Sequence, residues 1–419
     1  MNHPMQSKTR PHNGSRIGLV LGGGGALGAI YEIGALRALD EALEGVDFNH
    51  LYVYVGVNAG AFIAANLANQ MTTAQMCRIF VRNEADVHPF HPDVLYRPAF
   101  REYGRRMLAV PGLLMEAAAK LLANPGDQTV LDAFTTLAQA APAGLFENSG
   151  LEAYLARSYS LLGRTNDFRQ LRHRLYLLAA DLETGEAVRF GAPGLNQVPI
   201  SKAVQASTAT PVLYMPVEIN GRHYVDGTIR RGMHASVALE DGAELVLAIN
   251  PVVPIDAPAA VAAGTMSEGA LLNKGMPNVV AQAYRAMVYS RMNAGFELYE
   301  AQYPGRTLLR FEPRRDDARL FFSNIFSFQS RRVVCEHAYQ MTRRDLLARY
   351  EELSEALAPF GVTLKRDVLE DDQRTLSTSL YGASLPLYRH AEPTGFHPLK
   401  QLGERLEDIT ERFIPGRSK

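Results

Sequence analysis

The chain has 419 residues, of which 47% are hydrophobic and 21% are charged, a composition typical of folded globular proteins and unlike that of disordered, collagenous or disulfide-stapled chains. Its 43 basic and 44 acidic side chains leave a formal net charge of -1, so no overall positive field attracts nucleic acid. The two cysteines, Cys77 and Cys335, cannot form a disulfide framework, and neither has a Cys or His partner at metal-ligand spacing. We therefore expect a protein of a reducing, cytoplasmic compartment.

The N-terminal residues 1–15 are polar with scattered basic side chains, without the apolar stretch of a secretory signal. They predict a flexible tail. The segment from Leu51 to Cys77 carries no charge, but Gly, Asn and Gln interrupt it too often for a membrane span. No linker or fixed-period repeat marks a boundary. We expect one α/β domain over 16–251 with a helical insert at about 83–150, followed by a mainly helical extension over 252–419 that packs on this domain.

Two strand-turn-helix units open the domain. The apolar run Ile17–Leu21 predicts a buried strand that enters four glycines, after which apolar residues recur at helical spacing. A second strand is expected at Leu51–Val55, followed by a turn and a small-residue helix from about 61 to 68. This repeated pattern predicts parallel strands with helices on both faces. Later strands are expected at 174–179, 187–190 and 244–249, and amphipathic helices at 278–299, 330–350 and 397–413.

The glycine run after the first strand allows three interpretations. Gly23 to Gly28 satisfies the G-x-G-x-x-G spacing between a strand and a helix, which is typical of dinucleotide-binding loops. Such a site also needs an acidic residue at the end of the second strand, where this chain has Gly56 and Asn58. The glycines could instead form a purely structural turn, or present backbone N–H groups at a helix N-terminus as an oxyanion hole.

A second glycine-bounded turn, Gly56 to Gly60 (GVNAG), has the frame of G-x-S-x-G. Small residues in this frame allow a strained strand-to-helix bend, here called the elbow, that lifts the central side chain above the sheet. Downstream, Asp226 and Gly227 form an Asp-Gly pair. The glycine loop, elbow and Asp-Gly pair in this order resemble the patatin-like lipid acyl hydrolases. Three further segments also resemble that family: 180–185, 206–211 and 216–221.

The resemblance covers about residues 16–251 and implies an α/β fold, a three-layer α/β/α sandwich with a mostly parallel central sheet. It also implies a serine and aspartate pair, in which the carboxylate orients the hydroxyl and accepts its proton. By position, the site would consist of Asn58 in the nucleophile place, Asp226 as general base, and the N–H groups of Gly23, Gly24 and Gly25 as oxyanion donors. Gly28, Gly56, Gly60 and Gly227 complete the motif framework. The structural alternative for Asp226 is an ordinary Asp-Gly hairpin turn.

Three positions depart from the family pattern. An asparagine amide is not nucleophilic, so Asn58 cannot form an acyl-enzyme, and we expect the chain as written to be nearly inactive. The fold should tolerate Asn58, because asparagine adopts positive φ more readily than other non-glycine residues. Two histories would explain Asn58: a natural family member that lost catalysis, or a sequence deliberately changed from serine to stop turnover. Leu27 stands where relatives commonly have a basic residue, and Thr228 where they have glycine or alanine. Ser207 or Thr208 could supply a rescue nucleophile, although such hydroxyls are more often structural.

The insert carries a Met- and Leu-rich run, residues 105–115, that is basic at one end. It is typical of an interfacial helix or a lid over an apolar pocket, and equally of a core helix. His88 and His91 have near-metal spacing, but the prolines between them and the lack of further ligands predict no metal site.

These features predict hydrolysis of acyl esters of glycerolipids, without a cofactor, when serine stands at position 58. The partners expected are a lipid or acyl-ester substrate and a membrane surface contacted peripherally, not nucleic acid. One alternative is a non-catalytic lipid-binding or regulatory protein of the same fold. A more distant one is a nucleotide-binding protein that uses the glycine loop.

Overall fold

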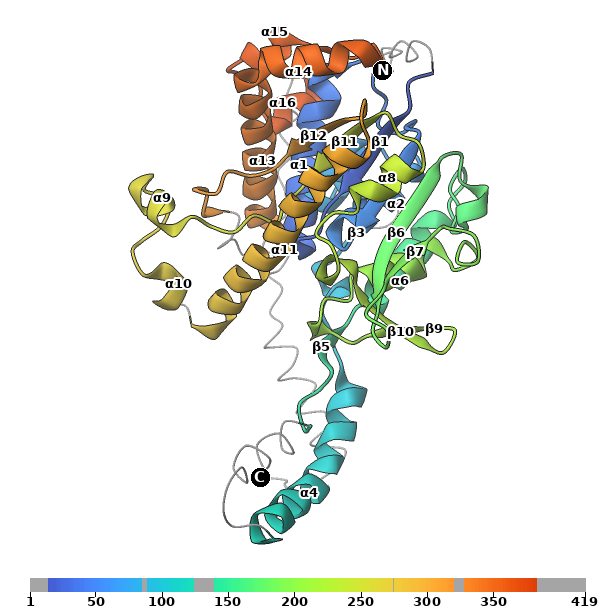
Figure 1. The fold of residues 1–419 in the computed structure, drawn as a ribbon, viewed down its shortest axis with the longest axis vertical. Helices are drawn as coiled ribbons and strands as arrows, with labels where there is room; N and C mark the ends of the chain where they lie inside the picture. Colours follow the sequence, from blue (N-terminus) through green and yellow to red (C-terminus); the bar gives the residue numbers. More distant parts are fainter. Residues whose placement is uncertain (1–13, 85–88, 124–138, 274, 320–327, 383–419) are drawn as a thin grey trace.

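The computed structural model describes residues 14–84, 89–123, 139–273, 275–319 and 328–382, drawn in colour in Figure 1. A mixed sheet lies at its centre in the order β12-β11-β1-β3-β6-β10-β9, with β7 paired to β6. Strands β12, β11, β1, β3 and β6 run parallel, whereas β10, β9 and β7 pair antiparallel. The strands are β1 Ile17–Leu21, β3 Val53–Val57, β6 Arg174–Asp181, β7 Ala187–Phe190, β9 Val217–Ile219, β10 Arg222–Asp226, β11 Leu245–Ile249 and β12 Thr307–Phe311.

Helices cover both faces of this sheet. Along β1, Leu19 and Leu21 belong to the core on one face and Val20 to the core on the other, because successive strand side chains point to opposite faces. The first face is covered by α1 Gly25–Ala42, α2 Ala59–Ala68, α7 Ile200–Ser207 and α13 Phe328–Ala348; the second by α8 Ala235–Glu240 and α11 Met276–Gln302. The expected three-layer α/β/α sandwich is confirmed.

The second strand differs from the sequence prediction. It was expected at Leu51–Val55 but spans Val53–Val57, because parallel pairing with β6 continues through Gly56 and Val57. The turn therefore starts at Asn58. The strand β12 was not predicted at all, and it lengthens the sheet by pairing with β11 from within the C-terminal extension.

Shorter elements complete the described chain. Two small sheets pair β13 Thr363–Leu364 with β2 Leu43–Glu44, and join β4 Arg97–Pro98, β5 Gly144–Glu147 and β8 Val212–Tyr214. The remaining helices are α3 Thr73–Met76, the π-helix Cys77–Val81, α4 Phe100–Ala123, α6 Ser149–Tyr159, α9 Ala257–Ala262, α10 Ala270–Asn273, α14 Tyr350–Leu357, α15 Arg366–Glu370 and α16 Leu376–Tyr381. Short 3-10 turns lie at Pro92–Val94, Phe168–Gln170, Gly227–Ile229 and Ala358–Phe360.

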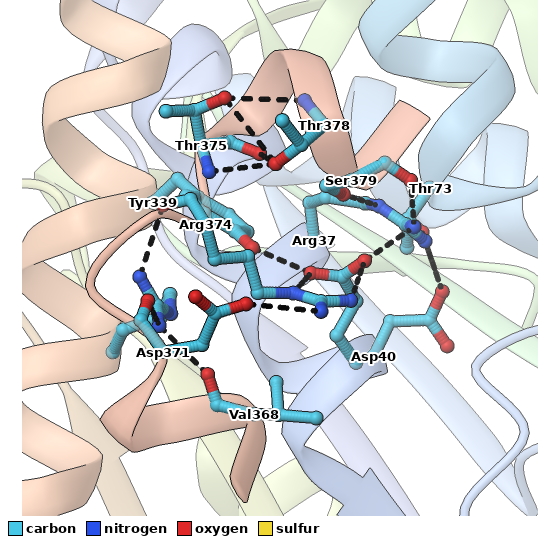
Figure 2. A network of polar contacts seen from close by, with 12 residues as sticks. Arg37, Asp40, Thr73, Tyr339, Val368, Asp371, Arg374, Thr375, Thr378 and Ser379 are labelled. Carbon is cyan, nitrogen blue, oxygen red and sulfur yellow. Dashed lines mark hydrogen bonds and ion pairs between the residues drawn. The ribbon is translucent and has the colours of Figure 1, made fainter. Parts of the chain in front are cut away.

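The C-terminal extension docks on α1 through α13. The two helices approach closely at Gly34, where an added Cβ would lie 2.4 Å from the carbonyl oxygen of Cys335. Beside this contact, buried Glu41 accepts hydrogen bonds from Arg37 (2.8 Å), Arg374 (3.0 Å) and the hydroxyl of Tyr339 (2.5 Å). Figure 2 shows how residues of α1, α13 and the chain around α16 converge in this network. The extension is therefore tied to the α/β core by both packing and charge.

The insert carries α4, which projects away from the body of the molecule (Figure 1). Met107 and Leu108 on this helix are 73% and 85% exposed, so the interpretation of this run as a core helix is wrong. Within the described ranges, no helix combines the length and apolar character needed to cross a membrane. His88 and the helix expected at 397–413 lie outside the described residues, as does nearly all of the expected N-terminal tail.

Candidate active site

The elbow joins β3 to α2, with Asn58 at its apex. Asn58 has φ 53° and ψ -117°, a strained conformation of the kind found at functional turns. Close packing requires glycine on both sides: a Cβ at Gly56 would lie 2.4 Å from the Gly60 carbonyl oxygen, and one at Gly60 would lie 2.3 Å from that of Leu21. The bend therefore holds the Asn58 side chain beyond the carboxyl end of β3.

The side chain of Asn58 is buried and bonded at both ends. Its Nδ2 donates to Asp226 Oδ2 at 2.5 Å and to Thr210 Oγ1 at 2.9 Å. Its Oδ1 accepts the backbone N–H groups of Gly25 at 2.9 Å and Ala59 at 2.7 Å. The structure thus brings the predicted nucleophile position, the predicted base and one of the predicted oxyanion glycines into a single hydrogen-bonded cluster.

Asp226 ends β10 and is 1% exposed. Its Oδ1 accepts the backbone N–H of Thr228 at 2.9 Å, and Thr210 Oγ1 donates to Oδ2 at 3.1 Å. Burial raises the pKa of Asp226 to about 6, against hydrogen bonds from Thr228, Thr210 and Asn58 that favour the ionised form. A carboxyl with its pKa near neutrality can serve as a proton acceptor at physiological pH.

The glycine loop runs from β1 into the N-terminus of α1. Gly24 and Gly25 have φ of 125° and 61°, values that L side chains adopt rarely. Gly23 and Gly28 are confined instead by packing, since added Cβ atoms would lie 2.3 Å from Thr228 Cγ2 and 2.8 Å from the Gly23 carbonyl oxygen, respectively. Of the three predicted oxyanion donors, Gly25 directs its N–H at the Asn58 side chain. Backbone donors at a helix N-terminus suit a developing negative oxygen.

Ala59 and Thr210 are site residues that the sequence analysis did not name. The N–H of Ala59 is the second donor to Asn58 Oδ1. The elbow motif could have indicated it, because the residue after the nucleophile position commonly contributes a backbone donor. Thr210 bonds both Asn58 and Asp226, and its position in the segment 206–211 gave no signal of that contact.

The two candidate rescue nucleophiles, Ser207 and Thr208, and the departing residue Leu27 all have structural roles. The Ser207 hydroxyl donates to the Leu178 carbonyl and accepts the Asn58 N–H, and the Thr208 hydroxyl donates to the Val204 carbonyl. Both hydroxyls thus serve backbone groups, as such side chains commonly do. Leu27 packs at the edge of the core.

Thr228, the other departure, packs against Gly23 and bonds the hydroxyl of Tyr284 from α11. Among the residues that the structure describes, which include His91, no group of three or more His, Cys, Asp or Glu could hold a metal ion.

A mostly apolar pocket opens beside Asn58. It lies between the glycine loop, the elbow and the insert. Its lining includes the polar side chains of Asn58, Asn148, Thr208 and Thr210. Most of the lining is aliphatic and aromatic and comes from α1, α2, the π-helix, the insert and β8, and it includes Ile30, Ile33, Phe62, Phe80, Phe90, Leu95, Tyr96, Leu213 and Tyr214.

Comparison with known proteins places this site in context. The family model described as patatin-like phospholipase matches residues 19–239, which include the glycine loop, the elbow and Asp226. Among solved structures, VipD from Legionella pneumophila is 16% identical, over 79% of this chain and 66% of that one, with a TM-score of 0.36. The complex of SpcU and ExoU from the type III secretion system of Pseudomonas aeruginosa also matches, at 16% identity, 69% and 53% coverage and a TM-score of 0.28.

Proposed function

Because the chain belongs to the patatin-like phospholipase family, we propose that the site around Asn58 and Asp226 is that of a lipid acyl hydrolase acting on acyl esters of glycerolipids when serine stands at position 58. The observation that carries the proposal is that both ends of the Asn58 amide form hydrogen bonds. Its nitrogen lies 2.5 Å from Oδ2 of Asp226, the proposed base, and its oxygen accepts hydrogen bonds from the backbone N–H groups of Gly25 and Ala59. A serine hydroxyl and the oxyanion of its tetrahedral intermediate would need the same neighbours.

In the serine form, Asp226 would accept the hydroxyl proton directly as the oxygen attacks the ester carbonyl. The N–H groups of Gly25 and Ala59 would stabilise the negative charge that develops on the carbonyl oxygen. Thr210 would hold Asp226 ionised through its hydrogen bond. The apolar pocket would take the acyl chain, since burial of hydrocarbon contributes about 0.8 kcal/mol per methylene. In this proposal, the chain as written would lack only the nucleophile.

The test is hydrolysis of a short-chain p-nitrophenyl ester by Asn58→Ser. We expect a rise of at least about a hundredfold over the unaltered chain, because a nucleophile and its base act together. The control Asn58→Ser/Asp226→Ala should return the rate to the unaltered level while keeping the folded circular dichroism spectrum. No gain in Asn58→Ser, or a gain that survives loss of Asp226, would contradict the proposed hydrolase.

A second function is favoured by the asparagine itself. The Asn58 side chain forms hydrogen bonds with the polar groups around it, and the apolar pocket opens beside it. This arrangement suits a protein that binds a lipid without cleaving it. In that case a fluorescent fatty-acid analogue binds the unaltered chain saturably, and Asn58→Ser binds it without turnover of any ester. Hydrolysis by Asn58→Ser would instead favour the first function.

We further propose that α4 contacts a membrane surface peripherally. Its exposed Met107, Leu108 and Met115 would enter the lipid interface, and the neighbouring Arg105 would face anionic head groups. Sedimentation with vesicles of phosphatidylcholine and phosphatidylglycerol should recover the native chain and lose most of a Met107→Ser/Leu108→Ser variant. Leu162→Ser, which alters an exposed leucine of a separate loop, is the matched control and should bind as the native chain does.

A further inference from the structure

The turn that carries Asp226 is packed against α11. It spans residues 226–232 and is called the base turn below. Three side chains of α11 contact it at a spacing of four and then three residues, which places them on one face of the helix. The contacts are Tyr284 with the Thr228 hydroxyl, Val288 with Gly232, where an added Cβ would lie 2.6 Å from Val288 Cγ1, and Arg291 with the Ile229 carbonyl at 2.9 Å. All three side chains lie beyond the residues 19–239 that match the family model, so the C-terminal extension supports the base turn.

Thr228 of the base turn contacts two parts of the candidate site. It is 3% exposed, and its backbone N–H donates to Asp226 Oδ1 at 2.9 Å. Its methyl carbon Cγ2 leaves no room for a side chain at Gly23, where an added Cβ would lie 2.3 Å from it. A shift of Thr228 would therefore move the carboxylate of Asp226 and the glycine loop relative to each other.

The hydrogen bond between Thr228 and Tyr284 has a defined direction. Burial raises the pKa of Tyr284, as does the negative charge of Asp226, so this phenol stays protonated at neutral pH and can donate. Burial raises the pKa of Asp226, and the Thr228 hydroxyl opposes that rise, which requires its O–H to point at the carboxylate. A hydroxyl has one proton to donate. In the bond between Thr228 and Tyr284, the tyrosine is therefore the donor.

We propose that Tyr284 is a positioning residue for Asp226: its hydroxyl donates to Thr228, which directs the Thr228 proton toward the carboxylate. The inference rests on the proposed function in one respect, since it takes Asp226 as the base. It extends that function by adding a residue of α11 to the groups that set the proton affinity of the base. Hydrogen bonds in such a chain polarise and strengthen one another. Loss of the Tyr284 hydroxyl should therefore weaken the interaction of Thr228 with the ionised carboxylate.

The proton affinity of Asp226 can be measured in the unaltered chain, without catalysis. Carbon-13 NMR of a chain labelled at its aspartate carboxyl carbons gives the pKa, and the Asp226 resonance is the one that Asp226→Asn removes. In Tyr284→Phe we expect this pKa to rise by about 0.5. Thr228→Val keeps a methyl group against Gly23 but lacks the hydroxyl, and should raise the pKa at least as much. The double variant should raise it no further than Thr228→Val alone, because both changes act through one hydroxyl.

Tyr289→Phe is the matched control. Tyr289 is also a half-buried tyrosine of α11, but its hydroxyl donates to Glu312 Oε1 at 2.8 Å, so its loss should leave the pKa of Asp226 unchanged. A thermal melt of each variant shows whether it folds. If Tyr284→Phe fails to fold, Thr228→Val decides the test, because Tyr284 acts through that hydroxyl: a raised pKa would support the inference, and an unchanged one would overturn it.

Ester hydrolysis gives a second measurement in the Asn58→Ser chain. Adding Tyr284→Phe should move the rise of kcat/KM to higher pH by the same amount as the pKa, and should lower kcat at pH 5 about threefold while KM stays within about twofold. A purely structural role for Tyr284 would lower the melting temperature without moving this rise.

An equal pKa of Asp226 in Tyr284→Phe and the unaltered chain would overturn the inference. An equal rise in Tyr289→Phe would do the same, as would effects of Tyr284→Phe and Thr228→Val that add in full. An inactive Asn58→Ser would contradict the proposed hydrolase alone, because the NMR titration of the unaltered chain still decides the role of Tyr284. An active Asn58→Ser whose pH profile does not change with Tyr284→Phe would leave the hydrolase standing and remove only this inference.

Discussion

At the scale of single residues, the candidate site follows from backbone geometry more than from side-chain chemistry. Gly56 and Gly60 could be predicted as the frame of the elbow because only glycine fits there, and the distances of 2.4 Å and 2.3 Å give the physical reason. Asn58 and Asp226 followed from their places in the motifs. Thr210 could not be predicted, because its role depends on a contact between segments 152 positions apart in the chain.

Under the proposed function, the buried Asp226 predicts how ester hydrolysis by Asn58→Ser depends on pH. Its pKa of about 6 means that the base is protonated below that pH and ionised above it, so kcat/KM of Asn58→Ser should rise through about pH 6 and level off. Thr210→Val removes a hydrogen bond that favours the ionised carboxylate, and should move this rise to higher pH. A pH profile of ester hydrolysis that is flat between about pH 5 and pH 8 would exclude Asp226 as the base.

Glu32 on α1 predicts a pH-dependent cost in stability. The carboxyl is fully buried, and burial raises its pKa well above the usual value. A raised carboxyl pKa favours folding at pH below about 4.5, and that contribution is lost as the pH rises through the folded-state value. At pH 8, Glu32→Gln should therefore have a higher urea midpoint than the native chain, with a free energy of unfolding about 1 kcal/mol larger. At pH 4 the variant and the native chain should differ little, and an equal gain at both pH values would contradict this assignment.

At the scale of elements, the sequence predicted those whose pattern is local. The strand Ile17–Leu21 and the helix that follows it have apolar residues in the correct period and glycines at the boundary. The strand β12 has only the short run TLLRF, and it becomes a strand because β11 offers a parallel edge. In the same way, α13 was predicted as an amphipathic helix, but its packing against α1 was not predicted, because packing between distant helices leaves no local signal.

The network around Glu41 predicts how firmly the last elements are attached. Burial opposes ionisation of Glu41, yet hydrogen bonds from Arg374 and Tyr339 and the charge of Arg37 lower its pKa overall. Arg374→Met should cost about 2 to 3 kcal/mol of unfolding free energy in urea, because it leaves a buried carboxylate with fewer partners. That cost should shrink as the pH falls below about 4.5 and Glu41 becomes protonated.

The matched control for Arg374 is Arg366→Met, which breaks an exposed ion pair with Glu370 on α15. Exposed pairs contribute less than about 1 kcal/mol, so its urea midpoint should stay close to that of the native chain. Equal losses in the two variants would show that burial of Glu41 does not determine the effect.

At the scale of the whole molecule, the extension completes the fold that the family-matched segment begins. Strand β12 forms one edge of the central sheet, and α13 covers the face of α1 that contains Gly34. The sequence analysis predicted an extension packed on the domain but neither of these two contacts, because the recognisable motifs end near Pro251. The sequence analysis ended the α/β domain at residue 251 because the recognisable motifs end there. In the described residues, both the central sheet and the hydrophobic core include residues beyond 251.

Truncation tests this dependence. A chain that ends at Gln302 keeps the matched segment and α11 but lacks β12 and α13, so it exposes the apolar side of α1 and an unpaired edge of the sheet. We expect the truncated chain to aggregate or to bind the dye ANS strongly. Co-expression of residues 303–419 should restore its solubility and lower its ANS binding. A monomeric truncated chain with a native melting temperature would mean that the extension is dispensable for folding.

The bonds of Asn58 also bear on how this chain could gain or lose activity over time. One side chain braces the glycine loop, the start of α2 and the end of β10. Serine is shorter and cannot span all three, so Asn58→Ser should melt at a lower temperature even as it gains a nucleophile. Under the proposed function, a serine at position 58 would therefore gain turnover at the cost of stability, because the asparagine there is stabilised by the same groups that a working enzyme would use for its substrate.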